Sequence, residues 1–210
     1  MKKYHEIFKN AFLISFFYTI SITSIVYINN ITKNQIVFQK EKEKKILLEQ
    51  VIPSKIYNTF KKELYIIKNK YLGDYKTHNL WVLFKNKKAK AAIVETIAPD
   101  GYSGSINMLV AAYFNGKIIG VRVLSHKETP GIGDKIELSV SNWITKFSNM
   151  SVSSLEDKHF ALKKYGGEIE QFTGATITPQ SVTNAIKKTV VFIKTIPSIL
   201  NLLNKDVCEY

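Results

Sequence analysis

An uncharged run near the beginning is the feature that most limits what this chain can fold into. Residues 11–28 are 18 consecutive residues without Asp, Glu, Lys, Arg or His, at the short end of the roughly 17–25 that a helix needs to cross a bilayer. Lys2, Lys3 and Lys9 precede the run and Lys33 is the only charge close behind it, which favours a cytoplasmic amino terminus. The run has no A-x-A-like cleavage site, so the sequence predicts an uncleaved membrane anchor and not a signal peptide.

The remaining length allows one domain of ordinary size. The chain has 210 residues and a hydrophobic fraction of 45%, which is typical of a globular protein. Residues 32 to about 70 read as helical and polar, broken at Pro53 and with a shorter helix around residues 56–65. We therefore expect five parts: a cytoplasmic tail (1–10), the anchor (11–28), a membrane-proximal helical segment (29–70), a folded domain (71–198) and a carboxy-terminal tail (199–210).

The chain is strongly basic, and lysine carries the charge. The formal net charge is +13, and Arg122 is the only arginine. A nucleic-acid surface usually uses arginine for bidentate contacts with phosphates and bases, and no nucleic-acid motif accompanies the charge. We therefore expect no nucleic-acid partner; a basic surface protein that binds nucleic acid or anionic lipid would show steeply salt-dependent binding. The single Cys208 and four scattered histidines predict neither an internal disulfide nor a metal site.

Strand signals occupy the middle of the chain. Residues 81–84 and 91–97 are rich in strand-forming residues, and two longer runs, 106–114 and 117–124, flank Asn115-Gly116. Asn-Gly between apolar runs predicts a hairpin with a type I′ turn, which we place near the middle of the sheet. The order of elements predicts an α+β fold, with one transmembrane helix followed by one domain in which helices pack on one side of an antiparallel sheet.

Two loops rich in glycine and proline flank this hairpin, at residues 99–104 and 128–134. Ordinary turns use the same residue types. Gly131 and Gly133, however, offer backbone N–H groups that no side chain covers, and this would suit a flat ligand lying close to the backbone.

Two more helices are predicted between this loop and the last helix. Asp134 is expected to cap an amphipathic helix, and Ser153 and Glu156 have the spacing of a capping box at the start of a shorter one. The apolar face of the first of these helices consists of Ile136, Leu138, Val140, Trp143, Ile144 and Phe147.

Residues 171–179 form a tight loop that leads into the last helix. Thr178 is the expected N-cap and Pro179 the first helical residue. Thr176 then lies just ahead of a helix N-terminus, where free N–H groups and the helix dipole favour a phosphate. A hydroxyl-rich turn is also an ordinary cap, and the spacing alone leaves both interpretations open. The helix is expected to end at Pro197, and its apolar face consists of Val182, Ala185, Ile186, Thr189, Val190 and Ile193.

Three segments together carry a resemblance to a known family. Thr173-Gly174-Ala175-Thr176 resembles the [Ser/Thr]-Gly-Ala-Thr flavinylation motif of the FMN-binding domain family. A short tail and one anchor, followed by 98–104, 128–137 and 171–179, are similar to the family of G subunits of the Rnf/Rsx ion-translocating electron transport complex. The motifs cover the domain from about residue 90 to 190, whereas the first 90 residues match in layout more than in letters.

The resemblance implies an electron-relaying flavoprotein without catalytic residues of its own and without a metal. In that family a dedicated flavin transferase joins FMN through its phosphate to the hydroxyl of the motif's last Thr, here Thr176. The FMN domain would face the periplasm at a bacterial inner membrane, beside the other subunits of a complex that passes electrons between a nicotinamide and a low-potential iron–sulfur acceptor. The implied cofactor-binding residues are Thr173, Gly174, Ala175, Thr176 and Thr178, with Thr129, Gly131 and Gly133 in the loop beside the flavin.

Two alternatives accompany this interpretation. The C subunit of the sodium-pumping NADH:quinone oxidoreductase shares the motif and the single anchor, but it is expected to be longer. A membrane-anchored scaffold or binding domain would leave Thr176 unmodified. Covalent FMN separates the scaffold from the flavoprotein, because it adds a yellow chromophore and the mass of FMN less one water.

Overall fold

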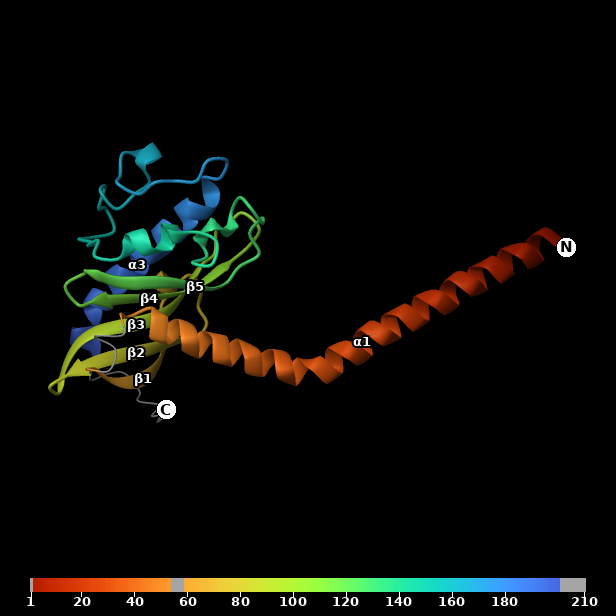
Figure 1. The fold of residues 1–210 in the computed structure, drawn as a ribbon, viewed down its shortest axis with the longest axis horizontal. Coiled ribbons are helices and arrows are strands. Elements are labelled where there is room, and N and C mark those ends of the chain that lie inside the picture. The colour runs from red at the N-terminus through yellow and green to blue at the C-terminus, as the bar shows by residue number, and fades with distance from the viewer. Residues whose placement is uncertain (1, 54–58, 201–210) are drawn as a thin grey trace. The chain divides into compact units, whose positions relative to one another are not determined.

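The computed structural model describes residues 2–53 and 59–200. The described residues up to 45 and those from 46 onward form two compact units, which we describe separately. The first unit is helix α1 (Lys2–Gln50) without its last turn, which belongs to the second unit. The second unit also contains a five-stranded antiparallel sheet and helix α3 (Ile177–Ile199), as Figure 1 shows. The predicted α+β order, a long apolar helix followed by an antiparallel sheet with helices, is confirmed.

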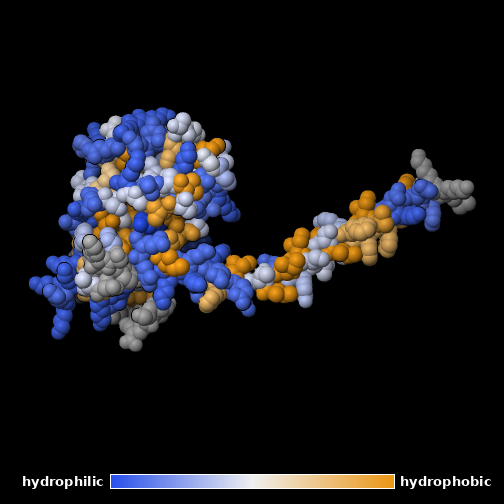
Figure 2. Space-filling model, in the orientation of Figure 1, coloured by the Kyte–Doolittle hydropathy of each residue, from blue (hydrophilic) through white to orange (hydrophobic). Residues whose placement is uncertain are grey.

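Helix α1 has the features of a membrane-spanning helix. It includes the whole 11–28 run, whose large apolar side chains are exposed and form the hydrophobic band on α1 in Figure 2. Thr19, Ser21 and Ser24 each donate their hydroxyl to the carbonyl four residues earlier, so these polar groups are satisfied inside the helix. Among the described residues, α1 is the one helix whose length and composition would let it cross a membrane.

The sheet is a meander in which every strand pairs with the next. Its order is β1 (Lys61–Ile67), β2 (His78–Lys85), β3 (Lys88–Ala98), β4 (Ile106–Tyr113) and β5 (Ile118–Ser125). The β4–β5 hairpin therefore lies at one edge of the sheet, and its predicted place near the middle is wrong. Strand β3 occupies the middle, because β1 adds a strand for which no strand had been predicted.

Strand β1 takes the place of a predicted helix. The helix expected around residues 56–65 is wrong where it can be compared, because Lys61–Ile67 is a strand; residues 54–58 lie outside the described part. Likewise the helical segment expected to reach residue 70 ends at Gln50. Tyr65 and Ile67 are buried and the intervening Ile66 is exposed, so pairing with β2 and burial of alternate side chains outweigh the helix propensity of the run.

The type I′ turn lies in a different hairpin from the predicted one. Between β4 and β5 only Gly116 has a positive φ (90°), and its N–H donates to the Tyr113 carbonyl, so this is a three-residue loop closed by a left-handed glycine. Between β2 and β3, Asn86 and Lys87 have φ values of 51° and 61°, the sign pattern of a two-residue type I′ turn.

Both faces of the sheet are buried, because helical residues pack on each of them. Helix α3 packs against β3 and β4 on one face, and the six apolar-face residues predicted for it are all buried. The last turn of α1 and the residues after it cover the other face through Leu47, Leu48, Val51 and Ile52. The prediction that helices lie on one side is therefore wrong. Pro197 does not end α3 either, since the helix continues to Ile199.

The chain between β5 and α3 is mostly irregular. The predicted amphipathic helix is wrong: two short 3-10 helices, η2 (Asp134–Ile136) and η3 (Asn142–Phe147), replace it, and Asp134 is the first residue of η2 instead of its cap. Ser141 interrupts the helix, because its hydroxyl donates to the Lys135 carbonyl (2.7 Å) and accepts from the Trp143 N–H (3.1 Å). Leu138 and Val140 consequently lie exposed, whereas the other four residues of the predicted face are buried.

The capping box predicted at Ser153 is also wrong. Residues 151–160 contain no helix, and Asp157 instead accepts hydrogen bonds from the Ser153 N–H (2.9 Å) and hydroxyl (2.8 Å). Farther on, Glu170 accepts from the ammonium groups of Lys146 (2.6 Å) and Lys163 (2.9 Å). Through these hydrogen bonds, the two carboxylates link separate parts of the irregular segment to one another.

Arg122 fastens the end of α1 to the sheet. Its guanidinium donates to the Val121 carbonyl (2.7 Å) and to the Gln50 carbonyl (3.0 Å), one of the carbonyls left unpaired at the end of α1. The planar guanidinium offers several donors in fixed directions, which suits two acceptors at once. The one arginine of this lysine-rich chain therefore lies where two backbone carbonyls accept from one side chain.

We predict that Arg122→Lys destabilises the second unit by about 1–2 kcal/mol, because a single ammonium cannot reproduce both hydrogen bonds. Thermal unfolding of the purified protein measures the change. Lys146→Arg is the matched control, since it exchanges the same head groups at an exposed ion pair and should leave the unfolding temperature nearly unchanged. An unaltered unfolding temperature for Arg122→Lys would contradict the assigned role.

Acid should weaken the irregular segment. Hydrogen bonds from the Ser153 N–H and hydroxyl lower the pKa of Asp157 to about 2, and those from Lys146 and Lys163 lower the pKa of Glu170 to about 2. Both pKa values lie near 4 in an unfolded chain. The stabilisation is therefore complete above about pH 4 and is lost as the pH falls toward 2.

We predict that Asp157→Asn lowers stability at neutral pH and flattens its decline between about pH 4 and pH 2, because the depressed pKa is gone. Unfolding midpoints measured across this range test the prediction. Glu156→Gln is the control, since its exposed carboxylate makes no hydrogen bond within the described residues. Equally steep acid curves for Asp157→Asn and the unsubstituted protein would refute it.

Candidate flavin site

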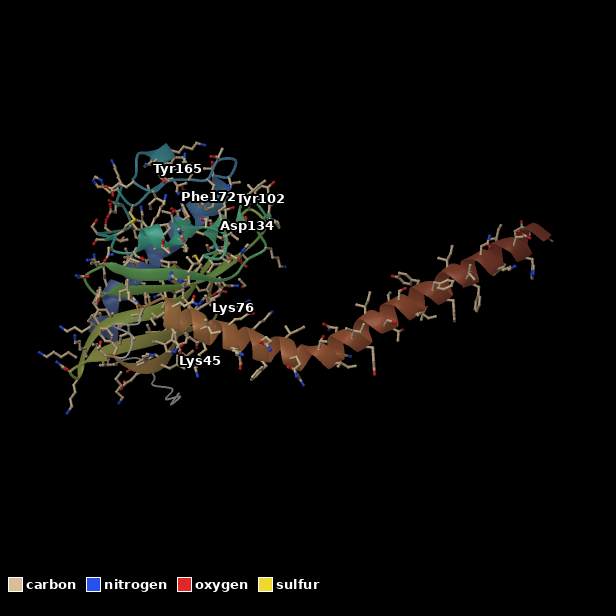
Figure 3. All side chains as sticks on the ribbon, in the orientation of Figure 1. Lys45, Lys76, Tyr102, Asp134, Tyr165 and Phe172 are labelled. Atoms are coloured by element: carbon tan, nitrogen blue, oxygen red, sulfur yellow. The ribbon has the colours of Figure 1, made fainter. Side chains whose placement is uncertain are left out.

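The three motif segments meet at one end of the sheet. Strand β3 ends at Ala98, β4 begins at Ile106 and β5 ends at Ser125, so antiparallel pairing brings the loops that follow β3 and β5 to the same end. Helix α3 also begins there. Figure 3 shows Tyr102, Asp134 and Phe172, one from each segment, at this end of the domain.

The buried carboxylate of Glu128 joins the three segments. Its Oε1 accepts the N–H of Ser103 (2.9 Å), and its Oε2 accepts the hydroxyl of Thr178 through a short hydrogen bond. Glu128 is 4% exposed and Thr178 is 1% exposed, so both bonds are shielded from water. One side chain thus connects the first loop, the second loop and the first turn of α3.

Two motif glycines make room for this carboxylate. A Cβ at Gly101 would lie 2.9 Å from Glu128 Oε1 and 2.2 Å from the Gly104 carbonyl oxygen. A Cβ at Gly133 would lie 2.9 Å from the Glu128 Cβ and 3.3 Å from the Thr178 hydroxyl. Any larger residue at either position would displace the hydrogen bonds of Glu128.

His126 orients Glu128 from the preceding side. The backbone N–H of Glu128 donates to His126 Nδ1 (2.9 Å), so the ring proton belongs on Nε2, which lies 2.8 Å from Glu137 Oε1. The loop between Glu128 and Glu137 is closed by the Thr129 carbonyl, which accepts the N–H groups of Ile132 (3.2 Å) and Gly133 (2.9 Å). The second motif loop is therefore fixed at both ends.

An aromatic anchor holds the turn of the third segment. Phe172 is buried against Trp143, with ring centroids 4.9 Å apart, and Trp143 Nε1 donates to the Glu170 carbonyl (2.6 Å). Ala175 N–H donates to the Phe172 carbonyl (3.3 Å), and the φ of Gly174 is 86°. A positive φ at the third position of a four-residue turn favours glycine, which explains the residue there.

Thr176 is the N-cap residue of α3. The helix begins at Ile177, two residues earlier than predicted, so Pro179 occupies its third position, where an N–H would still be unpaired. Thr176 is half-buried, and its hydroxyl makes no capping hydrogen bond. Within residues 59–200, no hydrogen bond occupies the N–H groups of Ile177 and Thr178. A hydroxyl and two free donors thus lie together at a helix N-terminus, which suits a phosphate.

The predicted site residues divide into free and engaged groups. The Thr178 hydroxyl and the Gly133 N–H already have protein partners, the Glu128 carboxylate and the Thr129 backbone carbonyl. Gly131 and Gly174 are exposed, and a Cβ at either would meet no protein atom within 4 Å. Thr129 and Thr173 are exposed, and Ala175 is half-buried beside Phe172. The roles of Glu128, Ser103 and His126 were not predicted, because burial of a carboxylate has no local sequence signal.

The segments also fit a polar cofactor. Within the described residues, two buried oxygen atoms of these segments, Asp134 Oδ1 and Gln171 Oε1, have no hydrogen-bond partner, and the same holds for Gln180 Oε1 and Ser181 Oγ in the following residues of α3. Buried polar atoms without protein partners are uncommon and are satisfied by water or a ligand. Together with the open space beside Gly131 and Gly174, they are compatible with FMN.

Comparisons with known proteins identify the domain that contains these segments. The FMN-binding domain family matches residues 101–191. Three proteins, each named as the G subunit of an ion-translocating oxidoreductase complex, are similar to the chain. One, from Buchnera aphidicola subsp. Schizaphis graminum, is 66% identical over 96% of this chain and 100% of its own length. Another, from Buchnera aphidicola subsp. Acyrthosiphon pisum, is 76% identical over 76% and 97%. The third, from Escherichia coli, is 45% identical over 84% and 85%.

These matches confirm the resemblance carried by the three motifs. At such identity over most of its length, the chain belongs to the family of G subunits of ion-translocating oxidoreductase complexes and contains an FMN-binding domain.

Proposed function

We propose that this chain carries an FMN bound to Thr176 by a phosphoester and relays electrons within its membrane complex. The chain is an electron carrier and not a stand-alone catalyst, and no residue of the site is assigned an acid–base role. When bound, FMN supplies the electron-transfer chemistry, and the protein sets its potential through hydrogen bonds and burial.

The three threonines of the loop differ in burial and in whether their hydroxyls are hydrogen-bonded, and this difference supports the proposal. Thr178 is buried and donates to Glu128, so its hydroxyl is already used. Thr173 is exposed in the turn, three residues before the helix N-cap. Thr176 combines an unused, half-buried hydroxyl with the free N–H groups of the first turn of α3. Only Thr176 therefore places an ester oxygen where the helix N-terminus stabilises the attached phosphate.

Attachment requires a partner enzyme that reaches this loop. The hydroxyl oxygen of Thr176 would form a bond to the flavin phosphorus, the bond from that phosphorus to its leaving group in the flavin donor would break, and the hydroxyl proton would leave. Thr173, Gly174 and Ile177 are exposed around Thr176, which gives a flavin transferase access. The free donors of Ile177 and Thr178 would then hold the phosphate oxygens.

The anchor supports a location at the bacterial inner membrane. The lysines before residue 11 favour a cytoplasmic amino terminus, and a single span would then put the FMN domain in the periplasm. A covalent bond would keep the cofactor from diffusing away there. The relatives that match over nearly their whole length are named as G subunits of ion-translocating complexes, which supports this assignment over the C subunit of the sodium-pumping enzyme.

We predict that Thr176→Ala folds normally but carries no covalent flavin after coexpression with a flavin transferase. Thr176→Ser should keep the flavin, because it keeps the hydroxyl. Fluorescence of the denatured protein in a gel is the measurement. Thr173→Ala is the matched control, since it removes a neighbouring hydroxyl from the same loop, and it should remain fluorescent. A fluorescent Thr176→Ala band would exclude Thr176 as the attachment site.

We predict that Glu128→Met destabilises the domain by about 3 kcal/mol and lowers the flavin content, because Ser103 N–H and the Thr178 hydroxyl lose their shared buried acceptor. Glu128→Gln should recover most of both, since its amide oxygen accepts from Ser103 and its NH₂ donates to the Thr178 oxygen. Thermal unfolding and flavin absorbance of each variant measure the two effects. Full flavin content and stability in Glu128→Met would refute the role of this carboxylate.

A further inference from the structure

One end of the sheet carries a cluster of exposed lysines. The β2–β3 hairpin contributes Lys85, Lys87, Lys88 and Lys90, and antiparallel pairing brings Lys61 of β1 and Lys117 before β5 to the same end. All six side chains are exposed. In Figure 2 the hairpin tip, at the lower left of the domain, is strongly hydrophilic, and Figure 3 shows nitrogen-tipped side chains projecting from it. We call these six residues the lysine cluster.

The cluster has almost no acidic counterpart. Within the described residues the only ion pair of the six is Lys61–Glu63 (3.6 Å), so five ammonium groups have no carboxylate partner. The opposite end of the sheet mixes both signs, with Lys68, Lys76 and Lys127 beside Asp74, Asp100 and Asp134. A lysine-rich composition alone would enrich both ends equally. The charge is therefore concentrated at one end of the domain.

The hairpin backbone gives a second, independent observation. Lys87 has a φ of 61° at the second central position of the type I′ turn, where glycine is strongly preferred. A residue other than glycine is uncommon in this conformation, because its Cβ crowds the backbone and raises the free energy of the folded state. Backbone conformations of this kind recur at functional positions, so the angle motivates a functional hypothesis for Lys87.

We infer that the lysine cluster binds the anionic phospholipid headgroups of the membrane in which α1 is anchored. Ammonium groups on flexible stems attract phosphates as point charges and need no fixed geometry, which suits a fluid lipid surface. The tether provided by α1 keeps the domain near the bilayer, so weak attraction is enough at the high effective concentration.

This contact would orient the flavin site. Strand β3 runs from the lysine cluster at Lys88 to the motif loops after Ala98, and its 11 residues span about 33 Å. The contact would therefore lie at the opposite end of the sheet from the motif loops. The inference goes beyond the electron-relay proposal and does not require FMN to be attached.

The test measures lysine reactivity in the full-length protein. We would place it in nanodiscs of phosphatidylcholine, with or without about 30% phosphatidylglycerol, label it briefly with an amine-acylating reagent and quantify each peptide by mass spectrometry. We expect the cluster to be acylated about threefold more slowly in anionic discs, and high salt to abolish this protection, because the attraction is screened. Lys68 and Lys76, at the opposite end of the sheet, are internal controls and should react equally in both discs.

Variants separate the charge from the fold. Lys87→Gly should raise the unfolding temperature, because it relieves the left-handed position, and should reduce the protection of the other cluster lysines. Lys68→Gln with Lys76→Gln removes two charges from the opposite end and should leave the protection intact. Equal acylation of the cluster in both kinds of disc, or protection that survives high salt, would overturn the inference. Protection that requires other subunits would overturn it too, and would assign the cluster to an acidic protein instead.

Discussion

The buried carboxylate of Glu128 is the contact on which the candidate flavin site depends. It joins segments that lie 25 and 50 residues away along the chain, at Ser103 and Thr178. A buried carboxylate is tolerated only when its oxygens accept hydrogen bonds, so the three segments must meet for the domain to fold. Because Thr178 lies in the first turn of α3, the same contact fixes the helix start and with it the position of Thr176. Gly101 and Gly133 leave room for this carboxylate, whereas a Cβ at Gly131 or Gly174 would meet no protein atom within 4 Å.

The features that could be predicted from the sequence are those with local signals. The anchor, the antiparallel sheet and the buried face of α3 follow from hydropathy and periodicity, and the three motif segments mark the end of the sheet where the site lies. The misses depend on distant partners. Strand β1 forms because β2 pairs with it. Ser141 divides the helix expected after Asp134 by binding the Lys135 carbonyl. Arg122, in strand β5, donates to the last carbonyl of helix α1. The burial of Glu128 needs donors from two other loops, so no local pattern could indicate it.

The two ends of the sheet differ in composition and charge. One end of the sheet holds the motif loops, where both charge signs mix and threonines, glycines and unpaired polar atoms gather. The other end holds lysines with few acidic partners. Between them, apolar residues fill both faces of the sheet, with α3 on one face and the end of α1 on the other. The motif loops and the lysines therefore lie at opposite ends of one continuous sheet with an apolar core on both faces.

Peptide mass spectrometry of the holoprotein can show whether Thr176 carries the flavin. Trypsin should release the peptide from Tyr165 to Lys187, which contains Thr173, Thr176, Thr178 and Thr183. We expect this peptide to be heavier by the mass of FMN less one water, and fragmentation to place the added mass on Thr176. An unmodified peptide from visibly yellow protein, or the added mass on another threonine, would exclude Thr176 as the attachment site.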